Sequence, residues 1–157
     1  SGADKVAINS AIINDINFLK EAVNIFGSST IVGSIVARRH RYNWQIFKDN
    51  AKHRVHMNPF EWAEILIKNG IGEIMLTSID KDGLETGFDA DLITKFDEIG
   101  TVPYLVSGGV GSIQHVLDII NNSKCSGVVI GSALHYKKFT VSELKQELSK
   151  NNIEVRF

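Results

Sequence analysis

Two glycine-bearing turns give the clearest chemical signal in the sequence. Ser107-Gly108-Gly109 follows the apolar run 102–106, and Gly131-Ser132-Ala133 follows the apolar run 127–130. Glycine permits positive φ and close backbone approach, and a following helix N-terminus directs unpaired N–H groups at an anion. The spacing therefore predicts a phosphate cup that includes Gly108, Gly109, Gly131 and Ser132. Two ordinary strand-to-helix turns are the alternative interpretation.

The composition describes an ordinary globular chain. Of 157 residues, 43% are hydrophobic and 22% are charged, with a formal net charge of −1. This balance does not favour nucleic acid or a membrane surface as a partner. We find no apolar stretch long enough for a membrane span and no signal peptide, so a cytoplasmic location is expected. The chain begins at Ser1-Gly2 and enters an apolar strand almost at once, which indicates a chain cut from a longer one.

Neither a metal nor another cofactor is expected. Cys125 is the only cysteine, so the chain can form no internal disulfide and no thiolate zinc site, and we interpret it as a structural thiol near the last strand. His40, His53 and His56 lie in one segment, but without paired carboxylates at ligand spacing.

Strands and helices alternate along the chain, at periodicities of two and 3.6 residues. The predicted strands are 5–9, 30–37, 73–79, 102–106 and 127–130. The predicted helices begin after the cap Ser10, after the cap Asn58, at Asp89, after Ser112 and at a capping box of Thr140 with Glu143. We read the chain as five parallel strands with intervening helices.

A longer segment, 38–58, interrupts this rhythm. The part 42–47 alternates enough for a small hairpin, with 48–50 as its turn. Because loops after the carboxyl ends of parallel strands often carry function, we interpret the segment as a solvated, basic, mobile loop near an anionic substrate.

Five such strands cannot close a small barrel, which needs eight. The sheet is therefore either open and doubly wound or part of a larger barrel. We predict a single partial (β/α)8 domain over 1–157, with 38–58 as a hairpin-like insertion. Its inward face would bear Val6, Ile8, Met75, Leu105 and either Val32 or Ile35.

Four motifs in order resemble the cyclase subunit of imidazole glycerol phosphate synthase, a TIM barrel of histidine biosynthesis. They are Asp4-Lys5-Val6-Ala7-Ile8-Asn9-Ser10, residues 72–83 (GEIMLTSIDKDG), Ser107-Gly108-Gly109-Val110-Gly111 and Glu154-Val155-Arg156. The resemblance covers essentially all 157 residues and aligns them with strands four to eight, so strands one to three are absent. A sister isomerase shares the pattern, but Ser78 in Thr77-Ser78-Ile79-Asp80 favours the cyclase.

The resemblance implies a barrel that takes ammonia from a partner glutaminase and cleaves a bisphosphorylated ribulosyl intermediate while closing an imidazole ring. One phosphate site would include Asp82, Gly83, Gly109, Gly131 and Ser132. The other would include Asn9 and Ser10, for which a helix cap is the alternative. Asp82 would act through its backbone N–H or by shaping the loop.

The resemblance also shows a departure from the family pattern. The family's strand-five catalytic aspartate aligns with Val36, which cannot move a proton, and the other carboxylate lies on the absent first strand. Thr77 remains as a polar group that faces the site. No catalytic pair is intact, so this chain alone is predicted to be inactive.

At the opposite end of the strands, Lys5 and Glu73 align with the family's ammonia gate, with a simple salt bridge as the alternative. Two further functions stay open. One is a glutaminase-partnered paralogue that supplies ammonia for amidino-sugar synthesis on surface polysaccharide or flagellin. The other is a non-catalytic assembly module, because the two terminal strands each lack a neighbour. We expect self-association or association with the missing barrel half.

Overall fold

The computed structural model describes residues 2–100 and 102–155. The strands are β1 (Val6–Ile8), β2 (Ile31–His40), β3 (Asn43–Lys48), β4 (His53–Val55), β5 (Glu73–Ser78), β6 (Tyr104–Ser107) and β7 (Gly127–Val129). The α-helices are α1 (Ser10–Asn14), α2 (Ile16–Phe26), α3 (Pro59–Lys68), α4 (Ala90–Asp97), α5 (Ile113–Asn122), α6 (Ser132–His135) and α7 (Val141–Lys150). A short 3₁₀ turn, η1 (Ser28–Thr30), precedes β2.

The predicted fold class is confirmed: one mostly parallel sheet, open at both sides, with helices between its strands. Strands β1, β2, β5, β6 and β7 pair in parallel, each with the next in that order. Strands β3 and β4 add two antiparallel pairings to the same sheet. Within the described residues β7 has no partner on its outer side and the sheet does not close, as expected of part of a barrel.

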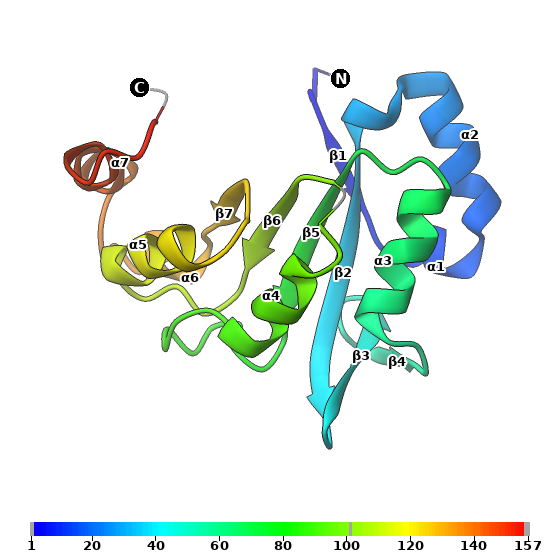
Figure 1. The fold of residues 1–157 in the computed structure, drawn as a ribbon, viewed down its shortest axis with the longest axis horizontal. Coiled ribbons are helices and arrows are strands. Elements are labelled where there is room, and N and C mark those ends of the chain that lie inside the picture. The colour runs from blue at the N-terminus through cyan, green and yellow to red at the C-terminus, as the bar shows by residue number, and fades with distance from the viewer. Residues whose placement is uncertain (1, 101, 156–157) are drawn as a thin grey trace.

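The longest strand is β2, and two other strands pair with it along the same edge. Its first half pairs with β1, from Val6↔Ile31 to Ile8↔Gly33, and its second half pairs with β3, from Val36↔Phe47 to His40↔Asn43. Figure 1 shows β3 and β4 beside the carboxyl end of β2, whereas α7 lies on the opposite flank from α1 and α2. The strand therefore runs to His40, three residues beyond its predicted end at Ala37.

The segment after β2 differs from the solvated loop that we predicted. Its hairpin turn falls close to the predicted one, between β3 and β4, but β3 also pairs with β2, so the segment is a three-stranded meander. Trp44 and Ile46 are buried, at 2% and 0% exposure, because they pack into the hydrophobic core. We call residues 38–56 the basic arm.

The capping residues expected from the sequence are confirmed for most helices. Side chains of Asn58, Asp89 and Ser112 cap α3, α4 and α5, and Thr140 with Glu143 forms the predicted capping box of α7. The first helix is the exception, because it breaks at Asp15, whose side chain caps α2. Ser10 is the first residue of α1 and not its cap, and Asn9 before it makes no side-chain capping bond. The single-turn α6 was not predicted.

Register decides which side chains share the inward face. In a parallel sheet, direct partners point to the same side, and so do residues that are two apart on one strand. Val32, Met75 and Leu105 therefore share one face with Ala7. Val6 and Ile8 pair with Ile31 and Gly33 and therefore face the helices, as Ile35 does. The expectation that placed Val6 and Ile8 inward was wrong by one residue of register, which moves a side chain to the other face.

Candidate functional site

One row of side chains crosses the sheet at the carboxyl ends of its strands. Successive register pairs join Arg54 to Phe47, Phe47 to Val36, Val36 to Thr77, Thr77 to Ser107 and Ser107 to Val129. All six side chains thus stand on the inward face of neighbouring strands, about 4.8 Å apart from strand to strand. We call this set the mouth row.

The mouth row contains no carboxylate. Val36 and Thr77 are partly exposed partners at its centre, and Ser107 leads directly into the first glycine turn. On the inward face of β2, β5, β6 and β7, the only carboxylate is Glu73, at the amino end of β5. A hydroxyl such as that of Thr77 can donate or accept a hydrogen bond, but it is a weak base at neutral pH.

The first glycine turn packs tightly against the loop after β5. Gly108 and Gly109 have φ of +95° and +101°, and a Cβ at Gly109 would stand 2.1 Å from the carbonyl oxygen of Gly87. The Gly87 N–H also donates to the Gly109 oxygen, at 2.8 Å. Only glycine suits this close approach, so the two loops form one unit.

The second turn is looser. Gly131 has a φ of −111°, so the positive φ expected there is absent, and a Cβ would meet nothing within 4 Å. Ser132 is the first residue of the four-residue α6. The phosphate contacts of Gly108, Gly109, Gly131 and Ser132 stay a prediction.

Asp82 and Gly83 lie exposed on the loop after β5. The Asp82 N–H donates to the carbonyl oxygen of Ser78 at 3.0 Å, which leaves the shaping of the loop as the route by which Asp82 would act. Gly83 has a φ of +74° with open space around it, a conformation that glycine adopts without strain, and its phosphate contact stays a prediction.

Asn9 and Ser10 connect the end of β1 to the basic arm. The Asn9 amide donates to the carbonyl oxygens of Ser34 and Phe47, at 2.9 and 3.2 Å. Ser10 donates its hydroxyl to Asn9 and accepts the N–H of Asp49 at 2.8 Å. The side-chain donors of both residues are therefore engaged within the chain, and their phosphate contact stays a prediction.

Lys5 and Glu73 meet at the opposite end of the strands. The Lys5 Nζ lies 2.8 Å from Glu73 Oε2, with side-chain exposures of 51% and 11%. The pairing brings together the two residues of the predicted ammonia gate. It fits a salt bridge equally well, so the gate stays a prediction.

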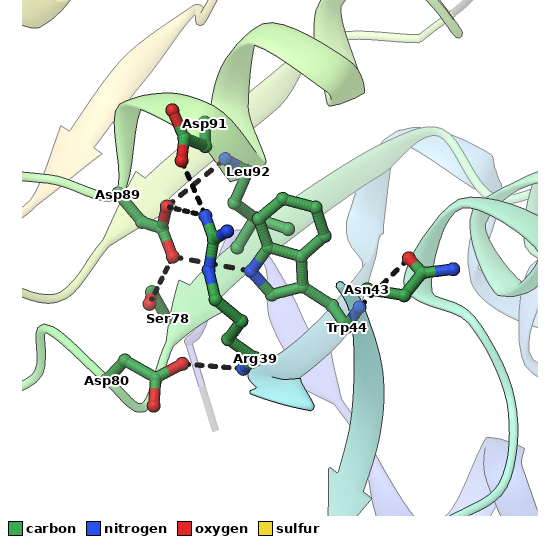
Figure 2. Close-up of polar contacts among 8 residues, drawn as sticks. All are labelled: Arg39, Asn43, Trp44, Ser78, Asp80, Asp89, Asp91 and Leu92. Carbon is green, nitrogen blue, oxygen red and sulfur yellow. Dashed lines mark hydrogen bonds and ion pairs between the residues drawn. The ribbon is translucent and has the colours of Figure 1, made fainter. Parts of the chain in front are cut away.

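Asp89 is the most connected polar side chain near the mouth, and sequence reasoning identified it only as a helix start. It is 7% exposed and accepts hydrogen bonds from Ser78 Oγ at 3.0 Å and Trp44 Nε1 at 3.4 Å. It also accepts the N–H of Leu92 at 3.2 Å. Figure 2 shows Asp89 at the meeting point of the basic arm, the end of β5 and α4.

Arg39 completes this cluster. Its guanidinium lies 4.4 Å from the centre of the Trp44 ring, 2.6 Å from Asp91 Oδ2 and 4.0 Å from Asp89 Oδ1. Its backbone N–H donates to Asp80 Oδ2 at 2.6 Å (Figure 2). The cluster fixes the arm to the loop after β5. The acidic partners of Arg39 lie 41 to 52 residues further along the chain, so no local signal identifies these contacts.

Perturbed pKa values lie away from the mouth row. Burial raises the pKa of the Cys125 thiol beside β7, in keeping with a structural role. Burial, together with a hydrogen bond to Asp97, also raises the pKa of Tyr104. A side-chain hydrogen bond with His53 lowers the pKa of Asp49. Within the described ranges, no group of three or more His, Cys, Asp or Glu side chains could hold a metal ion.

The larger cavities open on the helix side. One of about 510 Å³ lies between α4 and α5, against Phe88, Ile93 and His115. Another, of about 540 Å³, borders Arg39 and Asp89. In the described part of the chain, no helix is long and apolar enough to cross a membrane.

An open, mostly parallel sheet with intervening helices and glycine turns at its carboxyl ends defines the class: part of an α/β barrel. The chain belongs to the family described as "Histidine biosynthesis protein", whose sequence profile matches residues 1–140. It is similar to proteins named "Imidazole glycerol phosphate synthase subunit HisF", with 35% identity over 159 residues in Prochlorococcus marinus. The identity is 36% over 156 residues in Flavobacterium johnsoniae and 37% over 158 in Lactococcus lactis subsp. cremoris.

These alignments cover 99% of this chain but only 61 to 62% of each relative. The resemblance drawn from four motifs is thereby confirmed along the length of the chain. The Arg156 of the last motif lies outside the described residues.

Proposed function

We propose that this chain is the phosphate-binding part of a cyclase barrel of the imidazole glycerol phosphate synthase type, and that by itself it cannot carry out the cyclase reaction. Its ligand is a phosphorylated, sugar-type molecule held at the carboxyl ends of the strands. The remaining strands come from another polypeptide segment, and a glutaminase subunit docks at the opposite end of the barrel.

The observation that carries this proposal is the contrast between the glycine turns, which suit anion binding, and Val36, which cannot transfer a proton. The tight contact of Gly109 with Gly87 fixes the first glycine turn, where we expect the phosphate to bind, whereas the central position of the mouth row is Val36. Binding needs only the turns and helix N-termini, but proton transfer needs a group that can exchange a proton. The two capacities are thus separated in this chain.

The second candidate, a glutaminase-partnered paralogue for amidino-sugar synthesis, is supported by the Lys5–Glu73 pair. In this proposal the Lys5–Glu73 pair is the ammonia gate, and Val36 stands where the resemblance places a catalytic aspartate. A chain that still receives ammonia but performs different chemistry would have these features. The third candidate, an assembly module without catalysis, is supported by the unpartnered outer edge of β7.

Calorimetric titration with inorganic phosphate tests the binding proposal. We expect one phosphate per chain, and we expect Gly109→Ala to abolish binding because its Cβ would collide with the Gly87 oxygen. Gly27→Ala is the matched control, since Gly27 also has positive φ (+84°) but open surroundings far from the turns. Should Gly109→Ala fail to fold, Gly83→Ala probes the neighbouring loop after β5 without a collision. Phosphate binding that survives both substitutions would refute the cup.

A further inference from the structure

The two glycine turns differ in how firmly the fold holds them. Backbone contacts between Gly109 and Gly87 fix the first turn to the loop after β5. The pairing of β6 with β7 ends at Ser107↔Val129, so Gly131 of the second turn lies beyond the sheet. Among the described residues, no side chain caps α6, which follows this turn directly. An anion site made of both turns therefore needs a further contact that sets the second turn against the first.

Lys138 is rigidly attached to the second turn. Its N–H donates to the carbonyl oxygen of Ala133 at 2.9 Å. The N–H of Lys137 donates to the carbonyl oxygen of Leu134 at 3.1 Å, and Lys137 has a φ of +55°. These two bonds form a Schellman motif, in which glycine is the usual residue with positive φ, so a lysine there is strained. The motif fixes the backbone of Lys138 relative to α6 and its first residue, Ser132.

Glu85 is attached to the first turn. It lies in the loop after β5 and also has a positive φ, of +58°. Its carbonyl oxygen lies so close to Gly111 that a Cβ on Gly111 would stand 2.3 Å away. The backbone of Glu85 thus packs against the segment that leads from the first turn into α5.

The side chains of Glu85 and Lys138 meet and so join the two turns. Glu85 Oε2 lies 3.1 Å from Lys138 Nζ, with side-chain exposures of 24% and 47%. An ion pair this exposed contributes little to the stability of a fold. A carboxylate near an anion site also lowers the affinity for the anion through its charge. What the pair does supply is a direct connection between the supports of the two turns.

We propose that Glu85 and Lys138 are positioning residues, whose ion pair holds the second glycine turn against the first so that both turns reach one phosphate. The inference rests on the proposed function, because the phosphate cup is the site that they position. Neither side chain needs to contact the ligand for this role. Breaking the pair should weaken phosphate binding even when the substitution removes a negative charge.

Calorimetric titration with inorganic phosphate, at one pH and low ionic strength, separates positioning from a simple effect of charge. Glu85→Gln removes a negative charge, so electrostatics alone predicts tighter binding, whereas loss of positioning predicts weaker binding. We expect Glu85→Gln to weaken binding about threefold, and Glu85→Lys to weaken it further because two lysines then repel each other. Glu85→Lys combined with Lys138→Glu reverses the pair at the same net charge and should restore most of the affinity.

Glu98→Lys is the matched control. It makes the same charge change at the exposed C-cap of α4, at the opposite end of that helix from the loop after β5, and should leave the affinity nearly unchanged. Hydrogen exchange without ligand gives a second measurement. Residues 131–138 should exchange faster in Glu85→Gln and in Lys138→Gln than in the wild type, whereas 107–111 should not change.

The outcomes distinguish this inference from the proposed function. If the wild type binds phosphate and Glu85→Gln binds it equally or more tightly, the positioning role is wrong and the cup stands. A reversed pair that binds no better than Glu85→Lys, or unchanged exchange of 131–138, would also overturn the inference. If the wild type binds no phosphate, the cup fails, and the positioning role fails with it.

Discussion

Val36 and Thr77 are direct partners in the parallel pairing of β2 with β5, at the carboxyl ends of both strands. An aspartate at position 36 would therefore stand beside the Thr77 hydroxyl, with Ser107 one strand further on. In the chain as it is, an apolar side chain occupies that place. A carboxylate at this position would have hydroxyl neighbours on β5 and β6, whereas the side chain of Val36 cannot exchange a proton.

The chain alone should show no ammonia-dependent cyclase activity. Loss of groups that act together in one transition state costs many orders of magnitude, and Val36→Asp should not restore activity by itself, because the proposed reaction needs a second carboxylate, which the resemblance places on the first strand of the family's barrel. The measurement is turnover of the family's bisphosphate intermediate with ammonium, against a sample without protein. Turnover by the wild-type chain above that background would refute the proposal.

Asp89→Asn should destabilise the fold by about 2–3 kcal/mol. An asparagine can accept the Leu92 N–H, but its amide nitrogen cannot accept from Ser78 and Trp44 as the carboxylate does. Asp91→Asn is the control, since it also contacts Arg39 but is 72% exposed, and it should cost less than about 0.5 kcal/mol. Urea unfolding gives both values, and equal costs would show that Asp89 is not the centre of the cluster.

Lys5→Met should destabilise the chain more than Glu73→Gln does. Removing Lys5 leaves the Glu73 carboxylate, 11% exposed, without its cation, at a cost of about 1–2 kcal/mol after allowance for the exposure of Lys5. Glu73→Gln leaves the ammonium group of Lys5 without its carboxylate, but that group is half exposed to water, so the loss of stability is smaller. The double variant should recover part of the loss in thermal unfolding. A fully additive double variant would mean that the two side chains do not interact.

The capping box of α7 should make stability depend on pH. The Thr140 N–H and hydroxyl lower the pKa of Glu143 below its ordinary value, so its contribution is present above the unfolded-state pKa and is lost as pH falls through the folded-state value. Unfolding free energies measured from about pH 5 to about pH 3 should fall more steeply in the wild type than in Glu143→Gln. Parallel curves would exclude a contribution from this carboxylate.

The folded species should contain more than one chain. Among the residues that the structure describes, β7 has no partner on its outer edge, and Val6 of β1 and Ile25 of α2 are 47% and 69% exposed. Exposed apolar surface costs about 25 cal/mol per Å², which favours pairing with a second copy or with the remaining barrel strands. Sedimentation should report a dimer or a larger species. A stable monomer at micromolar concentration with cooperative unfolding would contradict this.

The alternation of strands and helices, the capping residues and the two glycine turns were readable from the sequence. These features depend on contacts between residues that are close in the sequence. Asn58 and Ser112 cap the helices that follow them, and Thr140 forms a capping box with Glu143, three residues later. The same local motifs, in order, also pointed to the family. Hydrogen bonding and periodicity over short distances thus determine the elements and their sequence along the chain.

Only the tertiary structure decided which face each strand presents and which distant groups meet. The pairing of β1 with β2 places Val6 on the face opposite to the predicted one. Side chains alternate with a period of two along a strand, so only the pairing with the partner strand determines which set faces inward. Asp89 meets Trp44 across 45 residues, and Arg54 joins the mouth row through two antiparallel pairings. Such contacts arise when the sheet assembles, so the chain order of the residues that make them does not reveal them.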